Sequence, residues 1–117
     1  MSIRPLFAAV VFVALAGCAS DPAPIEQVKL TEKAVEQARD VGATDEQPEL
    51  QMAEKKLAQV RIDMANQSYK QARMQAEQSE LDARLAEARV LTAKSQEQIN
   101  QLNTRLNRLR KQLGESQ

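Results

Sequence analysis

Residues 69–113 read YKQARMQAEQSELDARLAEARVLTAKSQEQINQLNTRLNRLRKQL and contain neither Gly nor Pro. Nonpolar and small residues recur here at alternating intervals of three and four, which places their side chains on one face of a helix. We therefore predict a single helix over residues 69–113, about 65 Å long at roughly 1.5 Å per residue. Its first stripe is made mainly of small residues: Tyr69, Ala72, Ala76, Ser79, Ala83, Ala86, Val90 and Ala93. Its second stripe is made of larger residues: Ile99, Leu102, Leu106, Leu109 and Leu113.

A second helix is predicted over residues 48–65, because Pro48 suits the first helical position and a matching stripe follows it. That stripe consists of Leu50, Ala53, Leu57, Val60 and Met64. Asn66-Gln67-Ser68 favours a turn that folds this helix back on the small-residue stripe, although a frayed point in one long helix is the alternative. Because residues 48–65 span only about 27 Å as a helix, the hairpin cannot cover the second stripe.

A first helix is predicted over residues 25–41, with Gly42 ending it in a left-handed conformation. Its stripe is Ile25, Val28, Val35, Ala38 and Val41. The predicted fold class is therefore all-α: a helical hairpin, or three-helix antiparallel arrangement, over residues 25–117, with a long C-terminal coiled-coil helix. Tyr69 is the only aromatic residue after the first 17 positions, so the core is expected to be thin and built from small side chains.

The N-terminal segment has the pattern of a secretory signal over residues 1–17. Arg4 is followed by an apolar run over residues 6–16, which is too short to span a bilayer. The run ends in Leu15-Ala16-Gly17-Cys18, which resembles the bacterial lipobox. An ordinary signal peptide with a chance cysteine is the alternative.

The lipobox resemblance implies that Cys18 carries a diacylglyceryl group and an N-acyl chain such as palmitate. Residues 18–24 would then form a lipidated linker. Ala19, in place of an inner-membrane-retaining Asp, implies an outer-membrane protein that faces the periplasm.

The residue inventory argues against an enzyme. The chain has no His, and Cys18 is its only cysteine. Zinc sites and Ser–His or Cys–His pairs are therefore not expected. Glu77 and Glu80 lie at helical spacing, but a solvated face is the simpler explanation, and Glu80 can pair with Arg84. With 16 acidic and 16 basic residues, no field for nucleic acid is expected. We predict no catalytic residues, metal, cofactor or small-molecule substrate.

The second stripe is the predicted partner-binding site, comprising Ile99, Leu102, Leu106, Leu109 and Leu113. In heptad notation Ile99, Leu106 and Leu113 are a positions, Leu102 and Leu109 are d, Arg105 is g and Arg110 is e. A parallel dimer would oppose these two arginines, so we expect either an antiparallel mate or another protein. Four bases cluster nearby and suit either the helix C-terminus or an anionic partner such as peptidoglycan: Arg105, Arg108, Arg110 and Lys111.

Residues 41–88 resemble domain-of-unknown-function family 4398, a group of small helical envelope lipoproteins. The resemblance rests on Gly42-Ala43, Pro48-Glu49-Leu50, residues 53–57, Tyr69-Lys70-Gln71-Ala72 and residues 76–86. It implies a structural or accessory role in the bacterial envelope. Together with the second stripe, this leads us to expect a structural or interaction protein whose long C-terminal helix binds itself or an envelope partner. The alternative is a non-covalent peptidoglycan tether or an accessory subunit of an envelope complex. Covalent tethering through a C-terminal Lys is not expected, since the sequence ends Gly114-Glu115-Ser116-Gln117.

Overall fold

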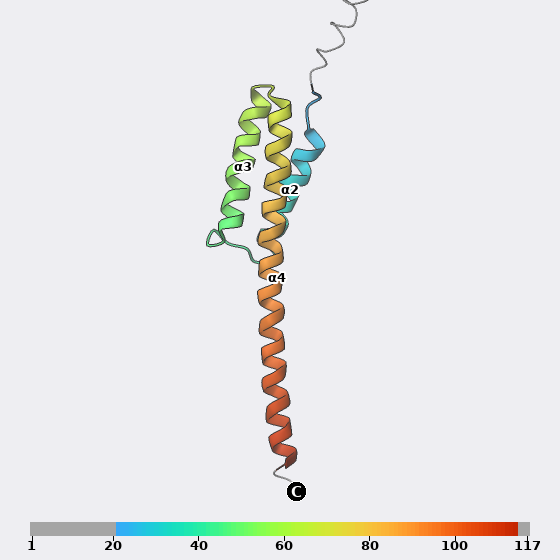
Figure 1. Ribbon diagram of the computed structural model, residues 1–117, viewed down its shortest axis with the longest axis vertical. Helices are drawn as coiled ribbons and strands as arrows, with labels where there is room; N and C mark the ends of the chain where they lie inside the picture. The colour runs from blue at the N-terminus through green and yellow to red at the C-terminus, as the bar shows by residue number, and fades with distance from the viewer. Residues whose placement is uncertain (1–20, 115–117) are drawn as a thin grey trace, which may run out of the picture.

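The computed structural model describes residues 21–114, which form three α-helices (Figure 1). These are α2 (Ile25–Asp40), α3 (Pro48–Ala65) and α4 (Tyr69–Gly114). Each begins where the sequence predicts, and α2 and α4 end within one residue of the predicted positions. The described part of the chain has no strand, and the all-α prediction with a long C-terminal helix is confirmed.

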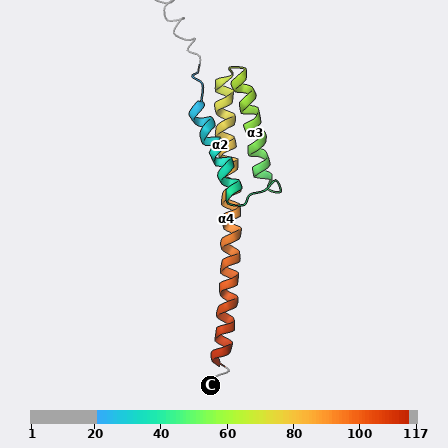
Figure 2. The same ribbon diagram turned by 180° about the vertical axis from the view of Figure 1, so that it is seen from behind.

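The helices form an up–down–up bundle around the first half of α4. Helix α3 runs antiparallel to α4, whereas α2 lies beside α4 and runs in the same direction (Figures 1 and 2). The turn at residues 66–68 is present, so α3 and α4 are separate helices. The predicted hairpin is therefore correct, and α2 completes it as a third helix.

Both connections leave a helix through the same hydrogen-bonding pattern, the Schellman motif. After α2, the amides of Gly42 and Ala43 donate to the carbonyls of Arg39 and Ala38, each at 2.9 Å. After α3, the amides of Gln67 and Ser68 donate to the carbonyls of Met64 and Asp63 at 3.1 and 2.8 Å. The left-handed residue is Gly42 in the first turn, with φ 106°, and Gln67 in the second, with φ 58°.

The core is thin because small side chains fill it, as predicted. Along α4 the buried residues are Ala72, Ala76, Ser79, Ala83, Ala86 and Val90. From α3 the main nonpolar contributors are Leu50, Ala53, Leu57 and Val60, and α2 adds Thr31, Ala34, Val35 and Ala38. Small residues let the helix axes approach closely, so the bundle is held by contacts near the backbone.

Two polar residues in this core bond directly to a neighbouring helix. The Thr31 hydroxyl lies 2.9 Å from the carbonyl oxygen of Ala76 on α4 and 2.9 Å from that of Gln27 on its own helix. The Ser79 hydroxyl donates to the carbonyl of Ala53 on α3 at 2.6 Å. Both side chains are fully buried, and hydrogen bonding offsets the cost of burying them.

Two residues of the predicted stripes are exposed and do not pack in the core. Ile25 is 53% exposed, because Thr31 and Ala34 occupy the face of α2 that meets α4. Ala93 is also exposed, because α2 ends at Asp40 and does not extend far enough to cover it. The burial of the small-residue stripe therefore stops at Val90.

Candidate functional site

The second half of α4 extends beyond the bundle as a bare helix. Val90 is the last buried residue of the described chain, and every residue from Leu91 to Gly114 is exposed. We call residues 91–114 the arm. The Lys94 ammonium donates to the Val41 carbonyl at 2.6 Å and marks the point where α2 leaves α4. From Val90 to Gly114 the arm reaches about 36 Å past the bundle, at roughly 1.5 Å per residue.

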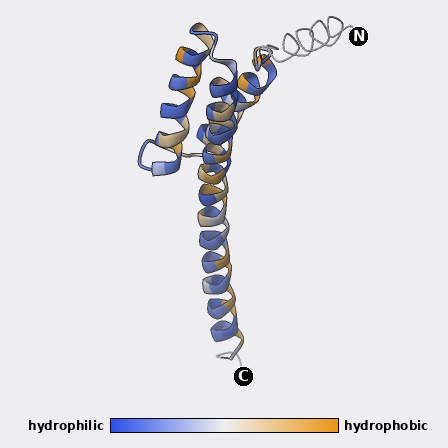
Figure 3. Ribbon diagram, turned by 45° about the horizontal axis from the view of Figure 1, so that its top comes forward, coloured by the Kyte–Doolittle hydropathy of each residue, from blue (hydrophilic) through white to orange (hydrophobic). Residues whose placement is uncertain are grey.

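The predicted partner-binding residues lie on this arm with large exposed fractions. Figure 3 shows hydrophobic colour recurring along it between hydrophilic turns. The exposed fractions run from 49% for Leu106 to 71% for Leu113. The intervening members are Ile99, Leu102 and Leu109. The structure thus brings these side chains together on one helix, while their binding to a partner stays a prediction.

This apolar stripe does not continue the buried face of α4. At about 100° per residue, Ile99 lies half a turn around the helix from Val90. Extending the buried face into the arm instead meets the polar side chains of Glu97, Asn100, Thr104, Asn107 and Lys111. The α4 helix therefore has one face that packs in the bundle and a nearly opposite face that carries the arm leucines.

The arm stripe continues back over the outside of the bundle, which the sequence analysis missed. Steps of seven from Leu102 lead to Ser95, Ala88, Leu81 and Met74, and steps of seven from Ile99 lead to Thr92 and Leu85. Met74, Leu81 and Leu85 are 43%, 67% and 46% exposed. We call the nonpolar residues at these a and d positions the outer seam: Met74, Leu81, Leu85, Ala88, Ile99, Leu102, Leu106, Leu109 and Leu113.

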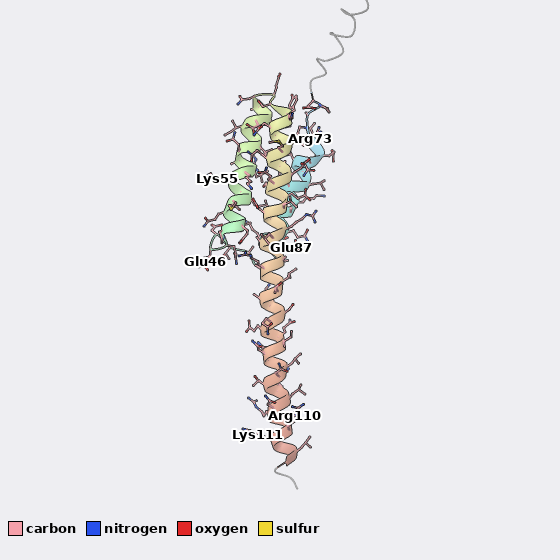
Figure 4. All side chains as sticks on the ribbon, in the orientation of Figure 1. Glu46, Lys55, Arg73, Glu87, Arg110 and Lys111 are labelled. Atoms are coloured by element: carbon pink, nitrogen blue, oxygen red, sulfur yellow. The ribbon has the colours of Figure 1, made fainter. Side chains whose placement is uncertain are left out.

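Polar contacts on the two flanks of α4 hold α2 and α3 away from the outer seam. On one flank Gln27 and Gln37 of α2 donate to Glu80 and Glu87 of α4 at 2.7 and 2.8 Å. Figure 4 shows Glu87 on this part of α4. On the other flank two ion pairs connect α3 to α4: Lys56–Asp82 at 2.6 Å and Glu49–Arg89 at 2.7 Å.

The resolved pKa shifts belong to the bundle and its connections. The hydrogen bond from Gln27, followed by that from Arg84, holds the pKa of Glu80 below its usual value of 4.5. The predicted Glu80–Arg84 pair is present at 2.6 Å. The pKa of Arg39 is raised by its hydrogen bonds to Glu54 and then Asp45. In both cases the hydrogen bonds favour the charged form of the side chain.

The arm has a basic end. Arg110 and Lys111 project from its final turns in Figure 4, where no second helix lies beside them. Residues 91–114 carry five bases and one acid, Glu97. Beyond Lys94, side-chain hydrogen bonds run along the same helix, such as the one that Gln101 donates to Glu97 at 3.2 Å.

Within residues 21–114, no group of three or more His, Cys, Asp or Glu side chains is placed to hold a metal ion. None of the helices there has the length and hydropathy needed to cross a membrane. Cys18 lies outside the described residues.

A family model described as "Domain of unknown function (DUF4398)" matches residues 26–102. The chain belongs to the DUF4398 family. In this DUF4398 protein the match begins at the second residue of α2, covers α3 and follows α4 as far as Leu102, so it includes Ile99 and Leu102 of the arm. The family resemblance predicted from residues 41–88 is therefore confirmed over a longer stretch.

A crystal structure of a DUF4398 family protein from Pseudomonas aeruginosa, at 2.47 Å resolution, is similar to this DUF4398 chain. The two are 58% identical in sequence, with a TM-score of 0.79. The alignment covers 82% of this chain and 100% of that chain. No curated protein matches the sequence.

Proposed function

We propose that this DUF4398 protein is a lipid-anchored lipoprotein of the bacterial outer membrane, facing the periplasm, whose α4 arm binds itself or an envelope partner. Its role is structural rather than catalytic. The observation that carries the proposal is the placement of two features at opposite ends of one helix. The described chain begins at Asp21, three residues after Cys18, and enters the bundle beside the start of α4, and the exposed arm leaves at the far end (Figure 1).

The entry of the chain supports an anchor at the bundle end. Pro24 is buried, and the Arg73 guanidinium donates to the Pro22 carbonyl at 3.5 Å. Figure 4 shows Arg73 near this end of α4. A lipid on Cys18 would therefore lie only a few residues from a packed part of the protein, which would hold the bundle close to the membrane surface.

The exposure of the arm supports a binding role. An isolated helix in water gains little stability from its backbone alone, so a bare arm benefits from a partner. Burying one leucine contributes about 1.5–3 kcal/mol, and four or five leucines in line can hold a complex after the cost of association. Contiguous exposed apolar surface of this kind is typical of protein interaction sites.

The basic end of the arm favours a second candidate, a non-covalent peptidoglycan tether or an accessory subunit with an acidic mate. Arg105, Arg108, Arg110 and Lys111 could attract the carboxylates of a cell-wall peptide. Such binding would weaken steeply with salt, because exposed charges are screened. Cosedimentation of the purified protein with peptidoglycan at rising salt tests this candidate.

The anchor is tested by labelling cells with a fatty-acid analogue. The wild-type chain should take up label and fractionate with the outer membrane, whereas Cys18→Ser should be unlabelled and poorly processed. Ala19→Asp is the matched control, since it should keep the label but move the protein to the inner membrane. Equal labelling of wild type and Cys18→Ser would refute the anchor.

A further inference from the structure

The outer seam has the spacing of a two-stranded coiled coil over more than the arm. In its heptads the buried face of α4 falls on positions b and f, position c meets α2 and position e meets α3. Glu80 and Glu87 are c residues bonded to α2, and Asp82 and Arg89 are e residues paired with α3. Positions a, d and g therefore face away from both helices, so a further helix can approach the seam beside the bundle.

Electrostatic repulsion disfavours a parallel coiled coil between two copies of this chain. In a parallel coiled coil each g residue faces the e residue five positions later on the other chain. This places Glu77 against Asp82, Arg84 against Arg89 and Arg105 against Arg110 of a second copy. All three are like-charged pairs. Because Asp82 and Arg89 already pair with Lys56 and Glu49 of α3, the first two conflicts are weakened, and the Arg105–Arg110 pair is the main obstacle to a parallel dimer.

An antiparallel mate with the same sequence removes every one of these conflicts in one register. In an antiparallel coiled coil, e residues of one chain face e residues of the other, and g residues face g residues. In the core between the chains, a residues pack against d residues. When Asp82 faces Arg110 of a second copy, Leu109 lies over Leu85, Leu113 over Leu81 and Leu106 over Ala88. The remaining charged e and g residues then face neutral side chains: Arg84 meets Gln112, Arg89 meets Asn103 and Arg105 meets Leu91.

Neighbouring registers are less favourable. Sliding one copy by a heptad in one direction sets Arg84 against Arg105 of the other copy, and sliding it in the opposite direction sets Arg89 against Arg110. Charge therefore selects one register as well as one orientation. Over residues 81–113 the overlap is about 50 Å long, at roughly 1.5 Å per residue.

We propose that the outer seam binds the outer seam of a second copy of this chain as an antiparallel coiled coil in the Asp82–Arg110 register. This inference rests on the proposed function, because it names the occupant of the arm that binds itself or an envelope partner. It also extends the interface from the arm onto the outside of the bundle, where Leu81 and Leu85 become covered.

The register predicts which residue lies beside the same residue of the second chain. The two-fold axis passes close to Gln96, so Gln96 of one copy lies beside Gln96 of the other. Asn103 occupies the same heptad position one repeat later and is also exposed, but in this register it faces Arg89. Because Cys18 is the only native cysteine, new cysteines at these positions can be compared against a nearly silent background.

The test compares Gln96→Cys with Asn103→Cys in the full-length protein in cells, under mild oxidation, with dimer bands read on non-reducing gels. We expect several-fold more cross-linked dimer for Gln96→Cys than for Asn103→Cys. A parallel dimer would give equal yields from the two e positions, and an arm-only antiparallel register would favour Asn103→Cys. Either result, or no dimer from either variant, overturns the proposal.

The failure of this inference can be separated from failure of the proposed function. Fatty-acid label without the Gln96 cross-link would leave the anchor intact and remove the second copy as occupant. The Gln96 cross-link in an unlabelled protein would support the pairing and refute the anchor.

Discussion

The hydroxyl of Ser79 donates a 2.6 Å hydrogen bond to the carbonyl oxygen of Ala53, inside the contact between α4 and α3. The Ser79 side chain has no exposed surface. A larger residue here would push the two helices apart, and a nonpolar one would remove a bond between them. This contact therefore sets the spacing of the hairpin as well as linking its helices.

Ser79→Ala should lower the free energy of unfolding by about 1 kcal/mol, the usual net value of a buried hydrogen bond. Thermal unfolding of the purified protein measures this. The control is Thr104→Ala, which removes a hydroxyl bonded to the Asn100 carbonyl within the exposed arm. A melting temperature unchanged by Ser79→Ala would show that the bond contributes nothing.

Ala83→Leu should destabilise the bundle by about 1–3 kcal/mol, because three extra carbon atoms must enter a fully packed contact. Ala93→Leu makes the same change on the same helix at an exposed position, and should leave the melting curve nearly unchanged. If both variants melt like the wild type, Ala83 is not a packing residue in solution.

Substitutions in the two Schellman turns should change the melting temperature in opposite directions. Gln67 holds a left-handed φ of 58°, which costs an L-residue about 1–2 kcal/mol. Gln67→Gly should therefore raise the melting temperature modestly, since the greater flexibility of unfolded Gly offsets part of the gain. Gly42→Ala should lower it, because φ is 106° and the new Cβ would lie 3.4 Å from Nζ of Lys94. Shifts of the same sign would contradict this account.

Acid should weaken the α2–α4 contact through Glu80. Its pKa is lower in the folded chain than in the unfolded chain, owing to Gln27 and then Arg84. The carboxylate thus contributes stability above pH 4.5 and loses it as the pH falls through the lower, folded pKa. Melting temperatures across this range should fall less for Glu80→Gln and for Gln27→Ala than for the wild type. If the melting temperatures of wild type and Glu80→Gln fall in parallel as the pH is lowered, Glu80 is not responsible for the loss of stability in acid.

Replacing Leu102 and Leu109 together by Lys should abolish association through the arm and leave bundle melting unchanged. Each replacement removes about 1.5–3 kcal/mol of stabilisation from burying a leucine, and it adds a charge that must be desolvated on association. Asn100→Lys with Asn107→Lys is the matched control, with the same charges at the same spacing on another face. Sedimentation of both double variants gives the answer, and equal association of the two would mean that the leucines are not the interface.

Much of the fold could be predicted because it depends on local pattern. The three–four spacing defined α3 and α4, and Gly42 and Pro48 marked the first connection. The turn after α3 was harder, since its left-handed residue is Gln67, a type that gives no signal for that conformation. The sequence favoured a turn there only through the weak helix formers around it.

The packing faces were less predictable because burial depends on neighbouring helices. A stripe drawn through nonpolar residues included Ile25 and passed over Thr31, whose hydroxyl is satisfied by a carbonyl of α4. The stripe also ran on to Ala93, although α2 ends before that level. The part of the outer seam that lies over the bundle was missed at Met74, Leu81 and Leu85, because Gln78, Thr92 and Ser95 interrupt the nonpolar pattern. Tracing heptads backwards from Leu102 is the signal that would have found it.

The unbroken course of α4 from Tyr69 to Gly114 has a mechanical consequence. A continuous helix transmits force along its axis, so a pull on the arm is delivered to the end where the chain leads to Cys18. In an antiparallel pair the two Tyr69 ends would lie about 84 Å apart, at roughly 1.5 Å per residue, and face in opposite directions. If Cys18 carries the proposed lipid, such a pair would be a rigid strut with one anchor near each end. The two anchors could then lie in one membrane, with the strut along it, or in two membrane surfaces held at a fixed separation.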